Sequence, residues 1–191
     1  MWYVMQVQTG SEEKIRTQCE TLIPQSVLQQ CFIPYYEEQR KLHGKWNLLK
    51  KVLFPGYLFM VTEELDELRL RLTRVQGMTK ILGTGDEIVP LTEEEVLFMQ
   101  KFGGEKQIVE ISKGILEGNQ VKILSGPLIG KEALIQKIDY HKRRAYLELE
   151  MFGRMQRICL GLEVKMEKVE KEEKTEPREH PEKKAKEKAA E

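Results

Sequence analysis

The hydrophobic pattern of this chain changes near residue 105, and that change limits the folds open to it. Before residue 105, strand-like runs alternate with segments that carry apolar residues at helical spacing. After it, short strand-like runs are separated by Gly, Pro and basic turns. The pattern predicts an α+β domain over 1–104, a linker over 105–112 and a small five-stranded β-barrel over 113–168. Residues 169–191 are nearly all charged, which predicts a disordered tail.

Within the first part, the pattern predicts an antiparallel sheet with three helices. Strands are expected at 2–7, 31–36, 53–60 and 79–82, helices at 9–22, 63–74 and 92–102, and a projecting hairpin at 37–51 with its turn at His43-Gly44. Thr9 with Glu12, and Thr92 with Glu95, have capping-box spacing at two of the helix starts. The barrel strands are expected at 120–124, 131–139, 144–151, 155–161 and 163–168.

The segment LFPGYLFM, residues 53–60, combines apolar strand residues with a Pro-Gly pair that interrupts a strand. The residue before a proline is held extended, and a Pro-Gly pair in a strand predicts a bulge that re-aims its neighbours. Leu58 and Met60 would then face the core, while Phe54 and Tyr57 face another surface. Two interpretations stay open: an exposed aromatic patch that docks a partner, or aromatic side chains that fill the core.

The net charge of the chain is zero, but its charges are unevenly distributed. Residues 113–166 carry ten Lys and Arg against six Asp and Glu, a net charge of +4. A basic module on a nearly neutral chain favours a polyanionic partner.

The sequence contains no residue pattern that supports catalysis, a metal site or a cofactor site. The three cysteines are far apart and fit neither a disulfide framework nor a zinc site, so we expect thiols in a reducing cytoplasm. The three histidines lack metal-type spacing, and Gly83-Thr84-Gly85 lacks the rest of a phosphate-binding loop. A signal peptide and a membrane-spanning run are not expected either. We therefore expect a cytoplasmic, monomeric protein that is not an enzyme and has no membrane partner.

Several of these stretches together resemble one family. WYVMQV near the start, FPGYLFM, and KILGTGDEIVPLTEEEV resemble the amino-terminal (NGN) domain of NusG-type transcription elongation factors. GNQVKILSGPLIGKEALIQKIDY and MFGRMQRICLGLEVKME resemble their carboxy-terminal KOW domain, so the resemblance covers residues 1–168.

The resemblance implies that the first domain binds RNA polymerase. It would dock on the β′ clamp helices, bridge to the β side of the cleft, and suppress pausing and termination. The residues implied to make this contact are Trp2, Tyr3, Phe54, Pro55, Tyr57 and Ile81.

The KOW-like part departs from the family pattern in two ways. Ala133 stands where the KOW signature usually has glycine, and the loop 140–144 is strongly basic. These departures resemble specialised antiterminator paralogs of the LoaP type more than the general factor. They imply capture of an RNA hairpin in a nascent leader transcript. The implied RNA-binding residues are Lys131, Lys137, Tyr140, His141, Lys142, Arg143, Arg144, Phe152, Arg154 and Arg157.

Other readings remain open at this point. In the first, the chain is a general NusG whose KOW domain contacts a ribosomal protein or termination factor, and the basic loop is only solvated. In the second, it is an RNA-binding, ribosome-associated protein, since KOW barrels also occur in ribosomal proteins.

Overall fold

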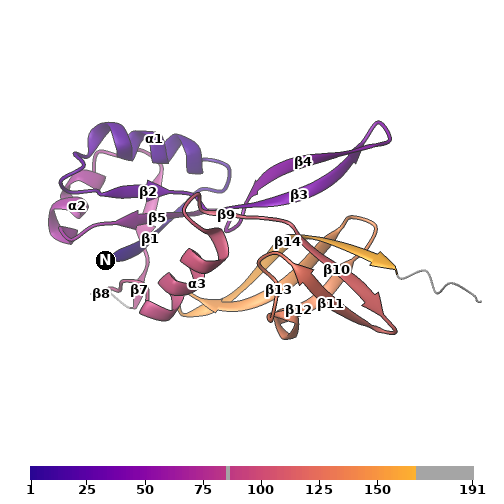
Figure 1. Ribbon diagram of the computed structural model, residues 1–191. Coiled ribbons are helices and arrows are strands. Elements are labelled where there is room, and N and C mark those ends of the chain that lie inside the picture. The colour runs from indigo at the N-terminus through magenta and orange to yellow at the C-terminus, as the bar shows by residue number, and fades with distance from the viewer. Residues whose placement is uncertain (85–86, 167–191) are drawn as a thin grey trace, which may run out of the picture.

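The computed structural model describes residues 1–84 and 87–166, and shows the expected α+β fold followed by a small β-barrel (Figure 1). The tail predicted at 169–191 lies outside the described residues. The first sheet has the strand order β2-β5-β1-β6, and every pairing in it is antiparallel. Its strands are β1 (Trp2–Val7), β2 (Gln30–Phe32), β5 (Tyr57–Val61) and β6 (Met78–Ile81).

Helices α1 (Glu12–Leu22) and α2 (Leu65–Leu72) cover one face of this sheet (Figure 1). Alternate strand residues decide which face each side chain takes. Met5, Leu58 and Met60 pack on the helix side, whereas Val4 and Phe59 point to the other side. The predicted inward direction of Leu58 and Met60 is thus confirmed. The second face is covered by α3 (Glu93–Gly103) and by the barrel.

The Pro-Gly pair forms a turn and not the expected bulge. The Tyr57 N–H donates to the Phe54 carbonyl at 3.2 Å, and Gly56 has φ 85°, as in a type II turn with proline at its second position. A Cβ on Gly56 would lie 3.2 Å from the Val7 carbonyl oxygen. The turn ends one strand and starts β5, so the apolar run is divided between two elements.

Only one of the two predicted capping boxes exists. Thr92 and Glu95 form a reciprocal box at the start of α3, as predicted. The Thr9–Glu12 box was wrong, because α1 begins after Ser11 and has no side-chain cap. Glu12 is instead buried, and its carboxylate accepts a 2.7 Å hydrogen bond from the Gly56 N–H. The Glu12 carboxylate therefore binds the Pro55-Gly56 turn, which is distant in sequence, and does not cap α1.

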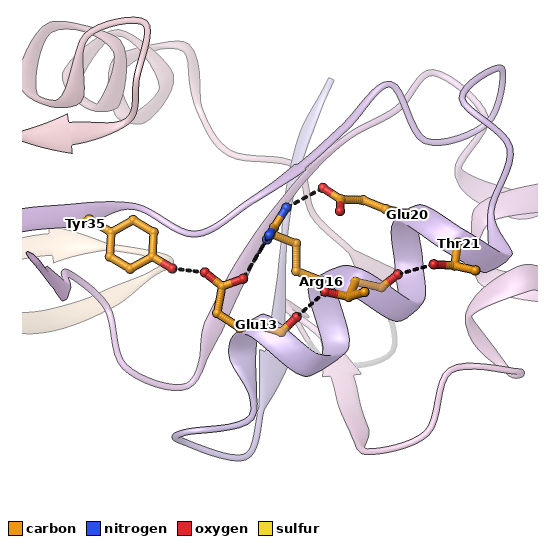
Figure 2. Close-up of polar contacts among 6 residues, drawn as sticks. Glu13, Arg16, Glu20, Thr21 and Tyr35 are labelled. Carbon is orange, nitrogen blue, oxygen red and sulfur yellow. Dashed lines mark hydrogen bonds and ion pairs between the residues drawn. The ribbon is translucent and has the colours of Figure 1, made fainter.

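A long hairpin, β3 (Tyr35–Leu42) and β4 (Lys45–Val52), projects from the amino-terminal part (Figure 1). The predicted strand 31–36 is therefore two strands, β2 and β3, which are separated by Ile33-Pro34. At its base, the Tyr35 hydroxyl donates to Glu13 of α1, and Arg16 pairs with Glu13 and Glu20 at 2.9 and 2.6 Å (Figure 2). The Tyr35–Glu13 bond joins the hairpin to α1, and Arg16 holds Glu13 in place from within the helix.

The segment predicted as a linker carries a strand. Within 105–112, β9 (Ile108–Val109) pairs in parallel with Tyr35 and Tyr36 of β3. Two short strands, β7 (Gly83–Thr84) and β8 (Glu87–Ile88), pair with each other between β6 and α3.

The barrel has five strands in the order β11-β10-β14-β13-β12. They are β10 (Ser112–Glu117), β11 (Gln120–Ser125), β12 (Ile135–Asp139), β13 (Arg144–Met151) and β14 (Arg154–Met166), with a 3₁₀ turn at Glu132–Leu134. The prediction missed β10 and divided β14 into two strands. Gly161 stays inside β14 because it lies against the hairpin: a Cβ there would be 2.4 Å from the Glu37 carbonyl oxygen.

Over the described ranges, no helix combines the length and the apolar character needed to cross a bilayer.

Candidate functional site

Aromatic rings gather on the sheet face opposite α1 and α2. Trp2, Phe32 and Phe59 come from β1, β2 and β5, which are neighbours in the sheet. The Trp2 and Phe32 centroids are 5.2 Å apart, and the Phe32 and Phe59 rings stack at 5.4 Å. The ring centroids of Phe54 and Phe59 are 5.9 Å apart. Together with Tyr57, these residues form what we call the aromatic surface.

The barrel contributes Phe152 to the cover of this surface, and Arg154 lies 6.0 Å from the centre of the Tyr57 ring. Phe152 lies in the β13–β14 turn, where its φ is 58°. Its ring centroid is 5.3 Å from Phe54, 5.5 Å from Tyr57 and 5.6 Å from Phe59. Phe54 is consequently only 2 % exposed, and the prediction that it faces outward is wrong for this arrangement. Tyr57 and Trp2 stay half-buried.

The other residues predicted to bind polymerase divide between two faces. Pro55 is exposed beside the aromatic surface. Tyr3 is 2 % exposed and packs with the core under the helices, as does the half-buried Ile81. Both therefore lie on the wrong face of the sheet to join Trp2 and Tyr57. Phe32 was not among the predicted contacts. Strand alternation, which puts it on the face opposite its neighbour Cys31, is the signal that could have found it.

Glu95 holds the covering turn in place. One carboxylate oxygen accepts from the Thr92 N–H at 2.8 Å, as the capping box requires, and the other accepts from the Phe152 N–H at 2.7 Å. A cavity of about 650 Å³ lies beside this contact, lined in part by Leu82, Phe98 and Phe152. The accessible space next to Phe152 lies between α3 and the barrel.

A second contact joins the barrel to the β3–β4 hairpin. Glu38 is only 2 % exposed, and Arg144 pairs with it at 2.9 Å. The Tyr36 hydroxyl donates to the same carboxylate at 3.1 Å. Burial, followed by the neighbouring Cys159 and Glu38, raises the pKa of Tyr36, so this hydroxyl stays protonated.

Arg143 also turns toward the hairpin. Its guanidinium lies 4.0 Å from the centre of the Trp46 ring, donates to Gln39, and pairs with Glu163 at 3.0 Å. Arg143 and Arg144 were predicted to contact RNA. In this arrangement their charged groups bind protein groups, and the RNA contact stays a prediction for both.

The remaining predicted RNA-binding residues do not form one patch. Tyr140, His141 and Lys142 are exposed at one end of β13, whereas Phe152 and the exposed Arg154 lie at the other end. Lys137 is exposed on β12, and Lys131 lies half-buried 5.8 Å from the Phe102 ring centre. Arg157 is exposed but pairs with Glu148 at 2.7 Å. Phe152 serves the contact between the two parts.

Comparison with known proteins agrees with the fold and the sequence motifs. The family model described as transcription termination factor NusG matches residues 1–100. The chain is 30% identical to the transcription termination/antitermination protein NusG of Staphylococcus carnosus, over 89% of this chain and 94% of that protein. It is also 30% identical to the protein of the same name from Thermus thermophilus, over 80% and 90%.

Among solved structures, that of Thermotoga maritima NusG, which comes from work on domain interaction, has a similar fold. Its TM-score is 0.55 at 24% identity, over 84% of this chain and 92% of that one. The family model spans more than half of the described chain, and the relatives align along most of its length. The chain belongs to the NusG family of transcription termination/antitermination proteins.

Proposed function

We propose that this protein binds RNA polymerase through the aromatic surface and suppresses pausing and termination during elongation. Residues 1–104 would act as the polymerase-binding domain and residues 113–168 as a second domain, joined by 105–112. The observation that carries the proposal is the way the aromatic surface is covered. Three strands and a turn supply its rings, and Phe152 of the barrel lies against Phe54, Tyr57 and Phe59 together.

A surface covered in this way suits exchange of one partner for another. Aromatic side chains that lose their cover would expose a contiguous apolar patch, which proteins use for binding. The partner would be the β′ clamp helices, with the rest of the domain bridging to the β side of the cleft. Polymerase would take the place of Phe152, after the Glu95 and Glu38 contacts to the barrel break.

We call the arrangement in which Phe152 covers the aromatic surface the closed arrangement. It would lower the apparent affinity of the protein for polymerase. A binding-competent form that is only partly populated reduces affinity in proportion to its population. The protein would therefore respond to anything that favours separation of the barrel from the aromatic surface.

We further propose that the barrel captures an RNA hairpin in the nascent leader, as a LoaP-type antiterminator would. Tyr140, His141 and Lys142 are exposed when the barrel covers the aromatic surface, and they would start this contact. The bound states of Arg143 and Arg144 support the alternative, a general factor whose barrel contacts a ribosomal protein or termination factor. A mobility-shift assay with leader RNA separates the two, since the alternative predicts little RNA affinity.

The polymerase contact is tested with Tyr57→Ala and Trp2→Ala, because both side chains are half-buried and neither anchors the core. Each is expected to weaken polymerase binding tenfold or more, since an aromatic anchor contributes about 2 kcal/mol. Leu97→Ala is the control, because Leu97 is 50 % exposed on α3. Wild-type affinity in both aromatic variants would overturn the proposal. Transcription across a terminator, with and without leader RNA, then tests antitermination.

A further inference from the structure

A basic groove lies between the β3–β4 hairpin and the β12–β13 turn, away from the aromatic surface. Its volume is about 590 Å³. One wall comes from the hairpin and includes Arg40, Lys41 and Lys51, and the other comes from the barrel and includes His141 and Lys142. Neither wall alone encloses the groove.

The positive charge of this groove is only partly neutralised. Glu38 lies in it, but its carboxylate is already bound by Arg144 and Tyr36. Asp139 pairs with Lys142 at a loose 3.7 Å. For Arg40, Lys41 and Lys51, the described part of the chain offers no ion-pair partner within 4.0 Å. The groove therefore favours a ligand with several negative charges.

An aromatic side chain lines the same groove. Trp46 is 38 % exposed, and Arg143 lies 4.0 Å from the centre of its ring. With the guanidinium on the ring, 38 % of Trp46 is still exposed to solvent. Basic side chains beside an accessible aromatic face are the combination that binds single-stranded nucleic acid, because phosphates pair with the charges and a base stacks on the ring. Bases within a duplex have their faces covered by neighbours.

We propose that this groove binds a single-stranded nucleic acid segment, with phosphates on Arg40, Lys41, Lys51 and Lys142 and a base on Trp46. The inference rests on the proposed function only for the presence of nucleic acid near the protein, and it adds the hairpin as a binding element. RNA and single-stranded DNA share this chemistry. Since the walls come from both parts of the chain, a ligand that spans them stabilises the closed arrangement.

The test measures fluorescence anisotropy of labelled single strands with the full-length protein. The probes are an oligouridylate and an oligodeoxythymidylate of about 12 nucleotides, a length that one small barrel and its neighbour can cover. The variants are Lys41→Glu with Lys51→Glu on the hairpin, and Lys142→Glu on the barrel. The matched control is Lys14→Glu with Lys113→Glu, which changes the charge equally on exposed residues outside the groove.

The hairpin double variant is expected to bind at least tenfold more weakly. Its salt dependence should also fall by about 1.4 in the logarithmic slope, since each phosphate contact contributes about 0.7 on a single strand. Lys142→Glu should weaken binding as well, whereas the control pair should change affinity less than about twofold. Trp46→Ala should weaken binding and Trp46→Phe should restore most of it, because any aromatic ring can stack.

The proposal that the groove binds single strands would be overturned if the hairpin double variant and the control pair had equal affinities for the probes. It would also be overturned if only Lys142→Glu lost affinity. A wild-type protein that binds neither probe would also overturn it. A preference for oligouridylate assigns the groove to RNA, and equal binding assigns it to single strands in general. Polymerase binding by the hairpin double variant is measured in parallel. Its retention shows that the proposed function stands whatever the groove does.

Discussion

The ring of Phe152 lies edge-on to the ring of Phe54, with 5.3 Å between their centroids and 70° between their planes. This geometry is one of the two arrangements that aromatic pairs prefer. The two residues are distant in sequence and lie in separate connections, Phe54 between β4 and β5 and Phe152 between β13 and β14, yet they are part of one continuous apolar cluster. Whether the aromatic surface is open or covered therefore depends on where the barrel lies.

Phe152→Asp is expected to release the barrel from the aromatic surface. A carboxylate placed among Phe54, Tyr57 and Phe59 would lose its hydration without gaining a partner, which is strongly unfavourable. We expect a larger radius of gyration by small-angle scattering and at least tenfold tighter polymerase binding. Met155→Asp is the control, because Met155 is 61 % exposed on the following strand. An unchanged radius in Phe152→Asp would show that other contacts hold the barrel.

Glu38→Ala should destabilise the contact between hairpin and barrel. It leaves Arg144, whose side chain is 25 % exposed, without its carboxylate partner. Loss of one partner from a fully buried pair costs about 3–5 kcal/mol, so this partly exposed case should cost about 2–3 kcal/mol. The free energy of unfolding from guanidinium titrations measures it. Glu37→Ala, the half-buried neighbour, should cost less than 1 kcal/mol, roughly the value of a weak surface contact.

Gly56→Ala should destabilise the protein by about 1–2 kcal/mol. The backbone there has φ 85°, a conformation that alanine adopts only with strain. The added Cβ would also lie 3.1 Å from the Thr9 hydroxyl oxygen. Gly118→Ala is a useful comparison: its φ is 61° and a Cβ would meet nothing within 4 Å. The difference in stability loss between the two variants, measured by thermal unfolding, isolates the contribution of the steric clash at Gly56. Equal losses in stability would show that backbone strain alone is responsible.

Stability should fall in alkaline solution partly because of Tyr35. Burial, followed by the hydrogen bond to the Glu13 carboxylate, raises the pKa of Tyr35 to about 12. A group whose pKa is higher in the folded chain stabilises it fully below the unfolded value near 10, and that contribution is lost as the pH rises through 12. The stability difference between wild type and Tyr35→Phe should therefore shrink between pH 10 and 12.

Glu13→Gln serves as the control for this titration. It removes the charge near Tyr35 and keeps its burial, so the alkaline loss should persist in a narrower pH range. Denaturant midpoints at pH 9, 10 and 11 provide the measurement. If the stability difference between wild type and Tyr35→Phe does not change with pH, the assignment of the alkaline loss to Tyr35 is contradicted.

The sequence predicted the elements well where local chemistry decides them. The aromatic and β-branched residues of 2–7 gave β1, and the Thr92–Glu95 spacing gave the start of α3. Leu58 and Met60 face the core as expected, although a turn and not a bulge precedes them. The same reasoning failed at Glu12, because a buried turn distant in sequence competes for its carboxylate. It failed at Gly161 because the glycine serves close packing against the hairpin and does not end a strand.

The sequence by itself determined an α+β part, a following five-stranded barrel, and a set of aromatic residues gathered around a Pro-Gly turn. These follow from periodicity, from turn residues and from backbone restrictions at proline and glycine, all of which act over a few residues. Only the tertiary structure decided that Phe152 covers Phe54 and that Glu38 binds Arg144. Such contacts depend on how two separately patterned surfaces pack, and no local pattern in either segment specifies its distant partner.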